Sequence, residues 1–248
     1  RTLLDEATAS HLVSDVPLGV FLSGGLDSSA LVAMMRRHIP GRLRTFTIGY
    51  ADKSFSELDY ARIVADRFDT DHQVLMVDDL KPDTVERALW HLDEPMTDLS
   101  CVPLMLVCEQ ARREVTVCLS GEGGDEIFAG YDRFKASRLN RYFRTVPRPL
   151  RHALIDALVR LLPDRPQKKG AINMLKRFLQ GARLPEAGAH LRWQFFGGAE
   201  QDRQLFTADF LGRVNPAPFR QVAEYLARCD GADAVNRELY LDTRFMMA

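Results

Sequence analysis

The sequence predicts an α/β fold: a parallel sheet sandwiched by helices, followed by a helical C-terminal part. Short apolar runs rich in β-formers alternate with stretches of helical period up to about Tyr131. Beyond that point strand patterns vanish and helical patterns dominate, with breaks at prolines and glycines. Two glycine-rich polar loops directly follow apolar runs. We therefore assign residues 1–135 to an α/β core and residues 136–248 to the helical part.

Each element of the core has its own pattern. The expected elements are a helix over 2–13, a strand over 16–22, a helix over 27–38, a strand over 43–50, a helix over 56–68, a strand over 72–77, helices over 80–92 and 102–113, and a strand over 114–119. Strands separated by helices of this length form parallel βαβ units. Ligands of such sheets bind outside the carboxyl ends of the strands. The turns after Leu22, Ile48 and Leu119 are therefore the expected location of the chemistry.

Composition excludes several function classes. The chain has 248 residues, with 33 basic and 34 acidic side chains, so its net charge is −1. That balance argues against a nucleic-acid binder held by bulk positive charge. Hydrophobic residues make up 46%, enough to bury a core. No apolar run approaches the roughly 20 residues that cross a bilayer, and no signal peptide is evident, so we expect a cytoplasmic protein.

Cysteine and histidine spacing gives no sign of a metal or redox centre. The four cysteines form no C-x-x-C pair, which disfavours a zinc ribbon or a redox dithiol. The six histidines include no H-E-x-x-H pattern. The chain begins at Arg1 and ends at Ala248 without a stop signal for its last helix, so we expect both ends to be cuts in a longer protein.

The first polar loop, residues 23–29, reads SGGLDSS between a strand and a helix. Two glycines are expected to take positive φ and turn backbone N–H groups inward, while the following helix directs its N-terminus at the same spot. The P-loop pattern with its lysine is absent. A carboxylate among phosphates needs a cation, so Asp27 is a candidate Mg²⁺ ligand. The alternative is a Gly-Gly turn whose Ser or Asp caps the helix. The phosphate-binding candidates are Ser23, Gly24, Gly25, Asp27, Ser28 and Ser29.

The second polar loop, residues 120–126, reads SGEGGDE after another strand. Three carboxylates within five residues repel one another unless a cation or proton intervenes. Asp125 is placed to be the second Mg²⁺ carboxylate. Glu122 is placed to act on a reacting group or to hold a cationic one. The alternative is a polar turn with a capped helix.

These two loops together resemble the synthetase domain of glutamine-dependent asparagine synthetases, a branch of the PP-loop ATP pyrophosphatases. The SGGLDSS loop resembles the PP-loop itself, and SGEGGDE narrows the match to the asparagine synthetase branch. Shorter segments follow in the same order: RTFTIG at 44–49, the stretch from His91 to Asp98, and LYLDTR at 239–244.

The resemblance implies an AMP- and pyrophosphate-forming amide ligase. An aspartate side-chain carboxylate would attack the α-phosphate of ATP, and ammonia would then displace AMP to give asparagine. Mg²⁺ on Asp27 and Asp125 would neutralise the departing charge. Glu122 would assist the ammonia step as an acid/base or by placing ammonium. The residues that would meet ATP outside the SGGLDSS loop are Phe21, Leu22, Ile48, Ser120 and Gly121.

The resemblance also has departures and leaves alternatives open. The N-terminal glutaminase domain that supplies ammonia in this family has no counterpart here and would be a partner in the parent protein. In the family, a lysine beyond the point where this chain stops helps stabilise the adenylate, so one alternative is a nucleotide-binding fragment that is inactive as truncated. A homodimer is a further open possibility. Gly124 stands where serine is common. That leaves room for a relative that amidates a cell-surface sugar or peptide, or closes a β-lactam ring. A tRNA-modifying PP-loop enzyme is disfavoured by the net charge.

Overall fold

The computed structural model describes most of the chain. The described residues are 2–50, 56–77, 80–93, 100–162, 171–184, 186–194, 203–214, 219–229, 232–245 and 247. They divide into two compact units, Arg1–Glu122 and Gly123–Ala248.

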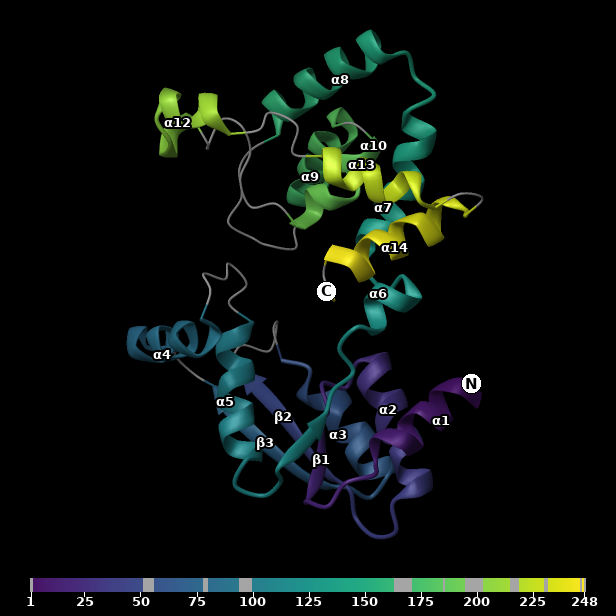
Figure 1. The fold of residues 1–248 in the computed structure, drawn as a ribbon, viewed down its shortest axis with the longest axis vertical. Coiled ribbons are helices and arrows are strands. Elements are labelled where there is room, and N and C mark those ends of the chain that lie inside the picture. Colours follow the sequence, from purple (N-terminus) through teal and green to yellow (C-terminus); the bar gives the residue numbers. More distant parts are fainter. Residues whose placement is uncertain are drawn as a thin grey trace. The chain divides into compact units, whose positions relative to one another are not determined.

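The first unit alternates helices and strands as predicted (Figure 1). Its elements are α1 (Thr2–His11), β1 (Leu18–Phe21), α2 (Leu26–His38), β2 (Arg44–Tyr50), α3 (Leu58–Arg67), β3 (Asp71–Val77), α4 (Pro82–Leu92), α5 (Cys101–Ala111) and β4 (Val117–Leu119). Two strands are shorter than predicted. β1 starts after Pro17, which has no N–H to pair, and β4 starts after the turn at Glu114 and Val115, whose N–H groups both bond back to Ala111 O.

The four strands form one parallel sheet in the order β3-β2-β1-β4. Val20 of β1 is level with Thr45 of β2, and Gly19 is level with Cys118 of β4. The carboxyl ends of β1 and β4 therefore lie next to each other at one edge of the sheet. The turns that follow these two strands are the two polar loops, so parallel pairing brings the loops together.

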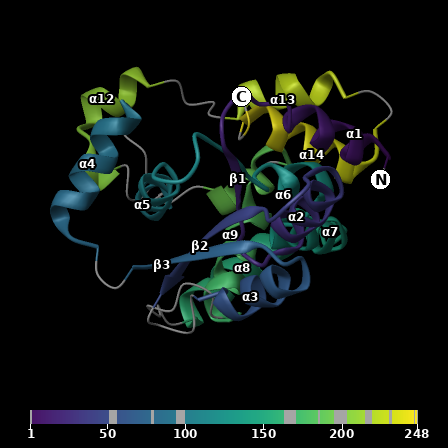
Figure 2. The ribbon, with the colours of Figure 1, turned by 90° about the horizontal axis from the view of Figure 1, so that it is seen from below.

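Helices cover both faces of this sheet (Figures 1 and 2). On one face, Val20 and Leu22 pack with Val32 and Met35 of α2 and with Ala61 of α3. The opposite face has a separate core. Its buried residues are Phe46, Val107, Ala111 and Val115, and the partly buried Phe21, Ile48, Leu75 and Cys118 pack against them. Successive residues of β1 thus point to opposite faces, as the pleat requires. The predicted helix-sandwiched parallel sheet is confirmed.

The second unit is helical throughout its described residues, as predicted. Its elements are α6 (Gly124–Phe128), α7 (Asp132–Phe143), α8 (Arg148–Leu161), α9 (Ala171–Arg183), α10 (Glu186–Ala189), the 3₁₀ helix η1 (Leu191–Gln194), α12 (Ala208–Arg213), α13 (Arg220–Ala227) and α14 (Ala234–Phe245). One apolar core joins Ile155 of α8 to Leu179 and Ala182 of α9. Another joins Leu191, Val222 and Leu241.

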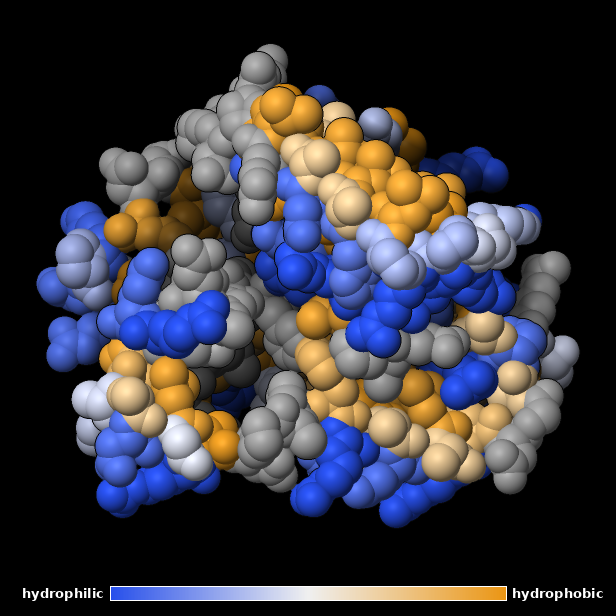
Figure 3. All heavy atoms as spheres, turned by 90° about the horizontal axis from the view of Figure 1, so that it is seen from above, coloured by the Kyte–Doolittle hydropathy of each residue, from blue (hydrophilic) through white to orange (hydrophobic). Residues whose placement is uncertain are grey.

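The surface mixes polar and apolar side chains. Figure 3 shows patches of hydrophobic surface between hydrophilic ones. Exposed apolar residues include Leu150, Leu154 and Leu161 of α8. Among the described residues, no helix combines the length and the hydropathy that would let it cross a membrane. The cysteines are free thiols, and Cys108 is exposed.

Candidate functional site

The first polar loop is fixed to the sheet at its start. Leu22, the residue after β1, lies in the core at 1% exposure. Its N–H donates to Phe46 O at 2.9 Å, and its carbonyl accepts from the buried Thr47 hydroxyl. Leu22 thus extends the pairing of β1 with β2 by one residue. It holds the loop at the carboxyl end of the sheet and shapes the candidate site from the core.

The two glycines of this loop have different conformations. Gly24 has φ +81°, and a Cβ there would lie 2.5 Å from Ala61 N at the start of α3. Glycine is therefore required at position 24 for two reasons, the positive φ and the close approach of α3. The expectation that Gly25 also takes positive φ was wrong. Gly25 is extended, with φ −66° and ψ 165°, because it is the N-cap of α2, where the chain enters the helix.

Three hydroxyls surround this turn. Ser23 Oγ accepts from Gly25 N at 3.2 Å and lies 3.0 Å from Ser28 Oγ. Ser28 is buried; its Oγ also accepts from Ser23 N at 3.3 Å. Ser29 Oγ donates to Gly25 O at 2.6 Å. The loop is thus held in shape by its own hydroxyls.

The N-terminus of α2 has no side-chain cap. Gly25 has no side chain to supply one, and the part of the chain that the structure describes makes no side-chain cap hydrogen bond there. The alternative of a turn whose Ser or Asp caps the helix is therefore wrong for this loop. An uncapped start leaves N–H groups of a 13-residue helix directed at the loop, together with the positive end of its dipole. This arrangement suits an anion.

Asp27 stands in the first turn of α2, half-buried beside this loop. A carboxylate is the hard oxygen donor that Mg²⁺ prefers, so the side chain fits a Mg²⁺ ligand. Among the described residues, no group of three or more His, Cys, Asp or Glu side chains gathers to form a metal site by protein ligands alone.

The second polar loop contacts the first within this unit. A Cβ on Gly121 would lie 2.9 Å from Ser28 N and 3.2 Å from the Asp27 carbonyl carbon. Only glycine allows this approach to the start of α2. Ser120 Oγ accepts from Glu122 N at 3.2 Å, which shapes the turn. The structure therefore brings Ser120, Gly121 and Glu122 beside the SGGLDSS loop.

The Glu122 side chain is exposed. Cys108 on α5 is exposed, but the protein around it still removes part of the water from its sulfur; this partial desolvation raises the pKa of the thiol, and the negative charge of Glu122 adds to that rise. The pKa of Cys118 on β4 is raised to about 11, mainly by burial and further by the neighbouring Cys108. Both thiols are thus kept in the protonated, weakly nucleophilic form. Of the three acidic residues of this loop, Glu122 is the exposed one.

Phe21 and Ile48 flank the loop from neighbouring strands. Both are half-buried and pack on the sheet face that α5 covers. Their backbones lie at the carboxyl ends of β1 and β2, level with the first loop. Part of the segment that resembles the family's substrate side, His91 to Asp98, lies outside the described residues.

The rest of the SGEGGDE loop opens the second unit. Gly123 has φ +86° and is the N-cap of the short helix α6. No side chain caps α6, so the capped-helix alternative is wrong here as well. The Asp125 carboxylate lies so close to the Gly130 backbone that a Cβ at Gly130 would collide with Oδ1. The absence of a side chain at Gly130 therefore leaves room for the Asp125 carboxylate.

Glu126 relieves the crowding of carboxylates by turning inward. Its side chain is buried and accepts from the Tyr131 hydroxyl at 2.6 Å. The pKa of Tyr131 is raised because the ring is partly buried and because its hydroxyl proton is held by Glu126. The three acidic residues of this loop therefore have different surroundings. Glu122 faces solvent, Asp125 lies against Gly130, and Glu126 holds the loop to Tyr131.

A buried ionic network supports this anchor, and sequence reasoning missed it. The Arg133 guanidinium lies 4.0 Å from the Tyr131 ring centroid and pairs with Asp242 of α14, Nη2 to Oδ2 at 2.8 Å. Asp242 is fully buried and also accepts from His190 Nε2 at 2.8 Å. The only sequence signal was an aspartate inside the apolar LYLD run, which is unusual for a buried helix face.

The whole sequence, residues 1–248, matches the family model described as asparagine synthase. The chain belongs to the asparagine synthase family. The suspected family is therefore confirmed.

Several named relatives agree with this membership. A protein of Mycobacterium tuberculosis, provisionally named as a glutamine-hydrolysing asparagine synthetase, is 38% identical over 197 residues, 77% of this chain and 30% of that protein. Asparagine synthetase (glutamine-hydrolysing) 1 of Bacillus subtilis is 29% identical over 252 residues, all of this chain and 37% of that protein. Amidase chyE of Penicillium rubens is 33% identical over 156 residues, 56% of this chain and 23% of that protein. The chain therefore spans about a third of the length of the curated synthetases it matches.

Proposed function

We propose that this chain is the synthetase part of an ATP-dependent amide ligase that forms AMP and pyrophosphate. The observation that carries the proposal is the uncapped N-terminus of α2, which faces the hydroxyls of Ser23, Ser28 and Ser29 at the carboxyl end of β1. Family membership agrees with ATP use at this place. The contact of Gly121 with Ser28 supports a single site built from both loops.

In the first step, a carboxylate oxygen of the acceptor attacks the α-phosphorus of ATP. An O–P bond forms, the bond to the β-phosphate bridging oxygen breaks, and pyrophosphate leaves with the electron pair. The β- and γ-phosphate oxygens would accept from the first N–H groups of α2 and from the loop hydroxyls. Phe21 and Ile48 would contact the nucleoside, and Ser120 and Gly121 would line the site beside the α-phosphate.

In the second step, ammonia attacks the acyl carbon of the adenylate. The C–N bond forms, the C–O bond to AMP breaks, and the surplus proton of the ammonia nitrogen passes to a base. Glu122 is proposed for that role because its carboxylate is exposed at the loop, whereas Glu126 is committed to Tyr131.

We propose Asp27, in the first unit, and Asp125, in the second unit, as Mg²⁺ ligands. Mg²⁺ bound there would offset the negative charge that builds up on departing pyrophosphate. Gly130 would serve this role indirectly, because any larger residue there would displace the Asp125 carboxylate.

The acceptor is proposed to be aspartate, giving asparagine, with ammonia from a glutaminase domain of the same protein. The names of the mycobacterial and Bacillus relatives support this assignment. A second candidate is amidation of a different carboxylate in a specialised relative. The amidase name of the Penicillium relative and the glycine at position 124 favour that alternative.

Product analysis tests the proposal. The chain is incubated with Mg-ATP, ammonium and aspartate, and AMP is separated from ADP, with an aspartate-free reaction as the control. AMP and pyrophosphate that appear only with aspartate would support both the reaction type and the acceptor. AMP with another carboxylate from a substrate panel would support the second candidate. ADP and phosphate as products would overturn the proposal.

A further inference from the structure

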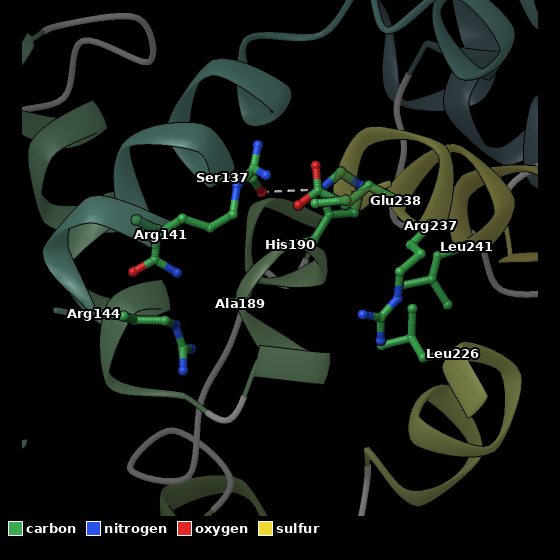
Figure 4. A pocket seen from close by; sticks show the side chains of 11 residues that line it. Ser137, Arg141, Arg144, Ala189, His190, Leu226, Arg237, Glu238 and Leu241 are labelled. Atoms are coloured by element: carbon green, nitrogen blue, oxygen red, sulfur yellow. Dashed lines mark hydrogen bonds and ion pairs between the residues drawn. The ribbon is translucent and has the colours of Figure 1, made fainter. Parts of the chain in front are cut away.

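The helical unit contains a cavity that the proposed reaction does not use. Its volume is about 50 Å³, and it lies between α7 and α14, with α10 and α13 completing the wall (Figure 4). Water needs roughly 10–15 Å³ of such volume per molecule, so the space holds a few waters or one small oxyanion. The lining residues are Ser137, Asn140, Arg141, Arg144, Ala189, His190, Leu226, Ala234, Arg237, Glu238 and Leu241.

Two helices place their polar side chains toward this cavity. Ser137, Arg141 and Arg144 recur at spacings of four and three residues and so share one face of α7 and its C-cap. On α14, Arg237 and Glu238 belong to the face that Leu241 anchors in the core. Figure 4 shows Arg141 and Arg144 approaching from one side and Arg237 from the other.

The charges around the cavity are unbalanced. Three arginines line it against one glutamate, Glu238. Burial raises the pKa of Glu238, and the nearby positive charges lower it only in part. The neighbouring Asp242 does not offset the excess, because it already pairs with Arg133 and His190. Several guanidinium groups around one small cavity are favourable only if an anion or water molecules compensate their positive charge.

Two covered polar atoms point to a missing ligand. Asn140 is 8% exposed, and its Oδ1 has no hydrogen-bond partner among the described residues. Arg237 Nε is likewise covered and without a partner there. Buried polar groups are normally paired. An amide flip would turn the Asn140 NH₂ group into the cavity, so both groups can donate.

We propose that this cavity is a binding site for a small tetrahedral oxyanion, of the phosphate or sulfate class. Arg237 Nε and the Asn140 amide donate to its oxygens, and Arg141 and Arg144 supply further positive charge. Fork-shaped guanidinium groups suit such oxygens better than a point charge does. The site is independent of the proposed reaction, because all its residues lie in α7, α10, α13 and α14 or next to them.

Calorimetric titration of the chain with inorganic phosphate and with sulfate, at constant ionic strength, tests the site. Arg237→Gln removes the charge and the Nε donor, and Asn140→Asp adds a negative charge without changing shape. Each is expected to weaken oxyanion binding at least tenfold. Arg138→Gln, at an exposed position of α7, is the matched control and should stay within twofold of the wild type.

ATP affinity separates this site from the PP-loop, which would also take phosphate. The expected result is weaker oxyanion binding with unchanged ATP binding in both variants. If Arg237→Gln fails to fold, as judged by circular dichroism, Asn140→Asp alone decides. With the PP-loop saturated by ATP, oxyanion binding that survives both substitutions, or no binding of either ion by the wild type at millimolar concentration, would overturn the proposal.

Discussion

Arg133 and Asp242 stand 109 residues apart and form a buried ion pair, with Nη2 and Oδ2 2.8 Å apart. Arg133 lies just after the SGEGGDE loop and rests on the Tyr131 ring, whose hydroxyl holds Glu126. Asp242 lies near the end of α14. The ion pair therefore links the start of the helical unit to its last helix.

Removal of Asp242 should destabilise the protein strongly. Asp242→Ala leaves Arg133 and His190 buried without their shared acceptor, and breaking one side of a buried pair typically costs about 3–5 kcal/mol. Urea unfolding measures the loss. The control is Asp132→Ala, because Asp132 forms an exposed pair with Lys135 that should contribute less than about 1 kcal/mol. Equal midpoints for the two variants would contradict the prediction.

Of the two glycines of the first loop, only Gly24 should be sensitive to replacement by alanine. Gly24→Ala puts a Cβ at φ +81° and 2.5 Å from Ala61 N. A left-handed alanine alone costs about 1–2 kcal/mol, and the clash adds to it. Gly25→Ala is the matched control: its φ is −66°, and the new Cβ meets only Ser23 Oγ at 3.2 Å. Thermal melts and ATP titrations should show loss of both stability and binding for Gly24→Ala alone.

Much of the fold follows from the sequence because its patterns are local. Alternating apolar runs and helical periods predict the parallel sheet, and the position of Gly24 after a strand predicts its turn. Gly25 could not be predicted, since two adjacent glycines look alike until one becomes the N-cap of α2. The partnership of Asp242 with Arg133 and His190 was also hidden, because it joins three distant segments whose meeting depends on how helices pack.

Asp27→Ala and Asp125→Ala should abolish Mg-ATP use and leave the fold intact. Both side chains lie at the start of helices outside the apolar cores, so their removal opens no cavity. AMP release and circular dichroism measure the two effects. Asp59→Ala, at an exposed position in the first turn of α3, serves as the control. A variant that unfolds would show that the carboxylate also holds the structure together.

Glu122→Ala should impair the ammonia step more than adenylation. Glu122 is exposed at the loop, and its backbone N–H, which bonds Ser120 Oγ, is kept in the variant. Pyrophosphate exchange into ATP reports adenylation, and amide formation reports the whole reaction. We expect amide formation to fall by about 10²–10⁴-fold, the range of a lost acid/base group, with exchange largely retained. Equal losses in both assays would assign Glu122 to ATP binding instead.

Stability should fall in mild acid because of His72. Burial is the main cause that lowers the pKa of His72. The positive charge of Arg62 lowers it further, and the negative charge of Asp66 opposes the shift. Its Nδ1 lies 2.9 Å from Thr45 Oγ1, while Nε2 is covered and has no partner among the described residues.

The unfolded chain therefore binds the His72 proton more readily than the folded one does. The stabilisation is fully present above the ordinary histidine pKa of about 6.5 and is lost as pH falls through the lower folded value. Urea unfolding at pH 8 and pH 5 measures the difference. His72→Asn, which keeps a partner for Thr45, should reduce the pH dependence, whereas His11→Asn on the exposed face of α1 should leave it as in the wild type. A pH dependence that His72→Asn does not change would assign the acid sensitivity to other groups.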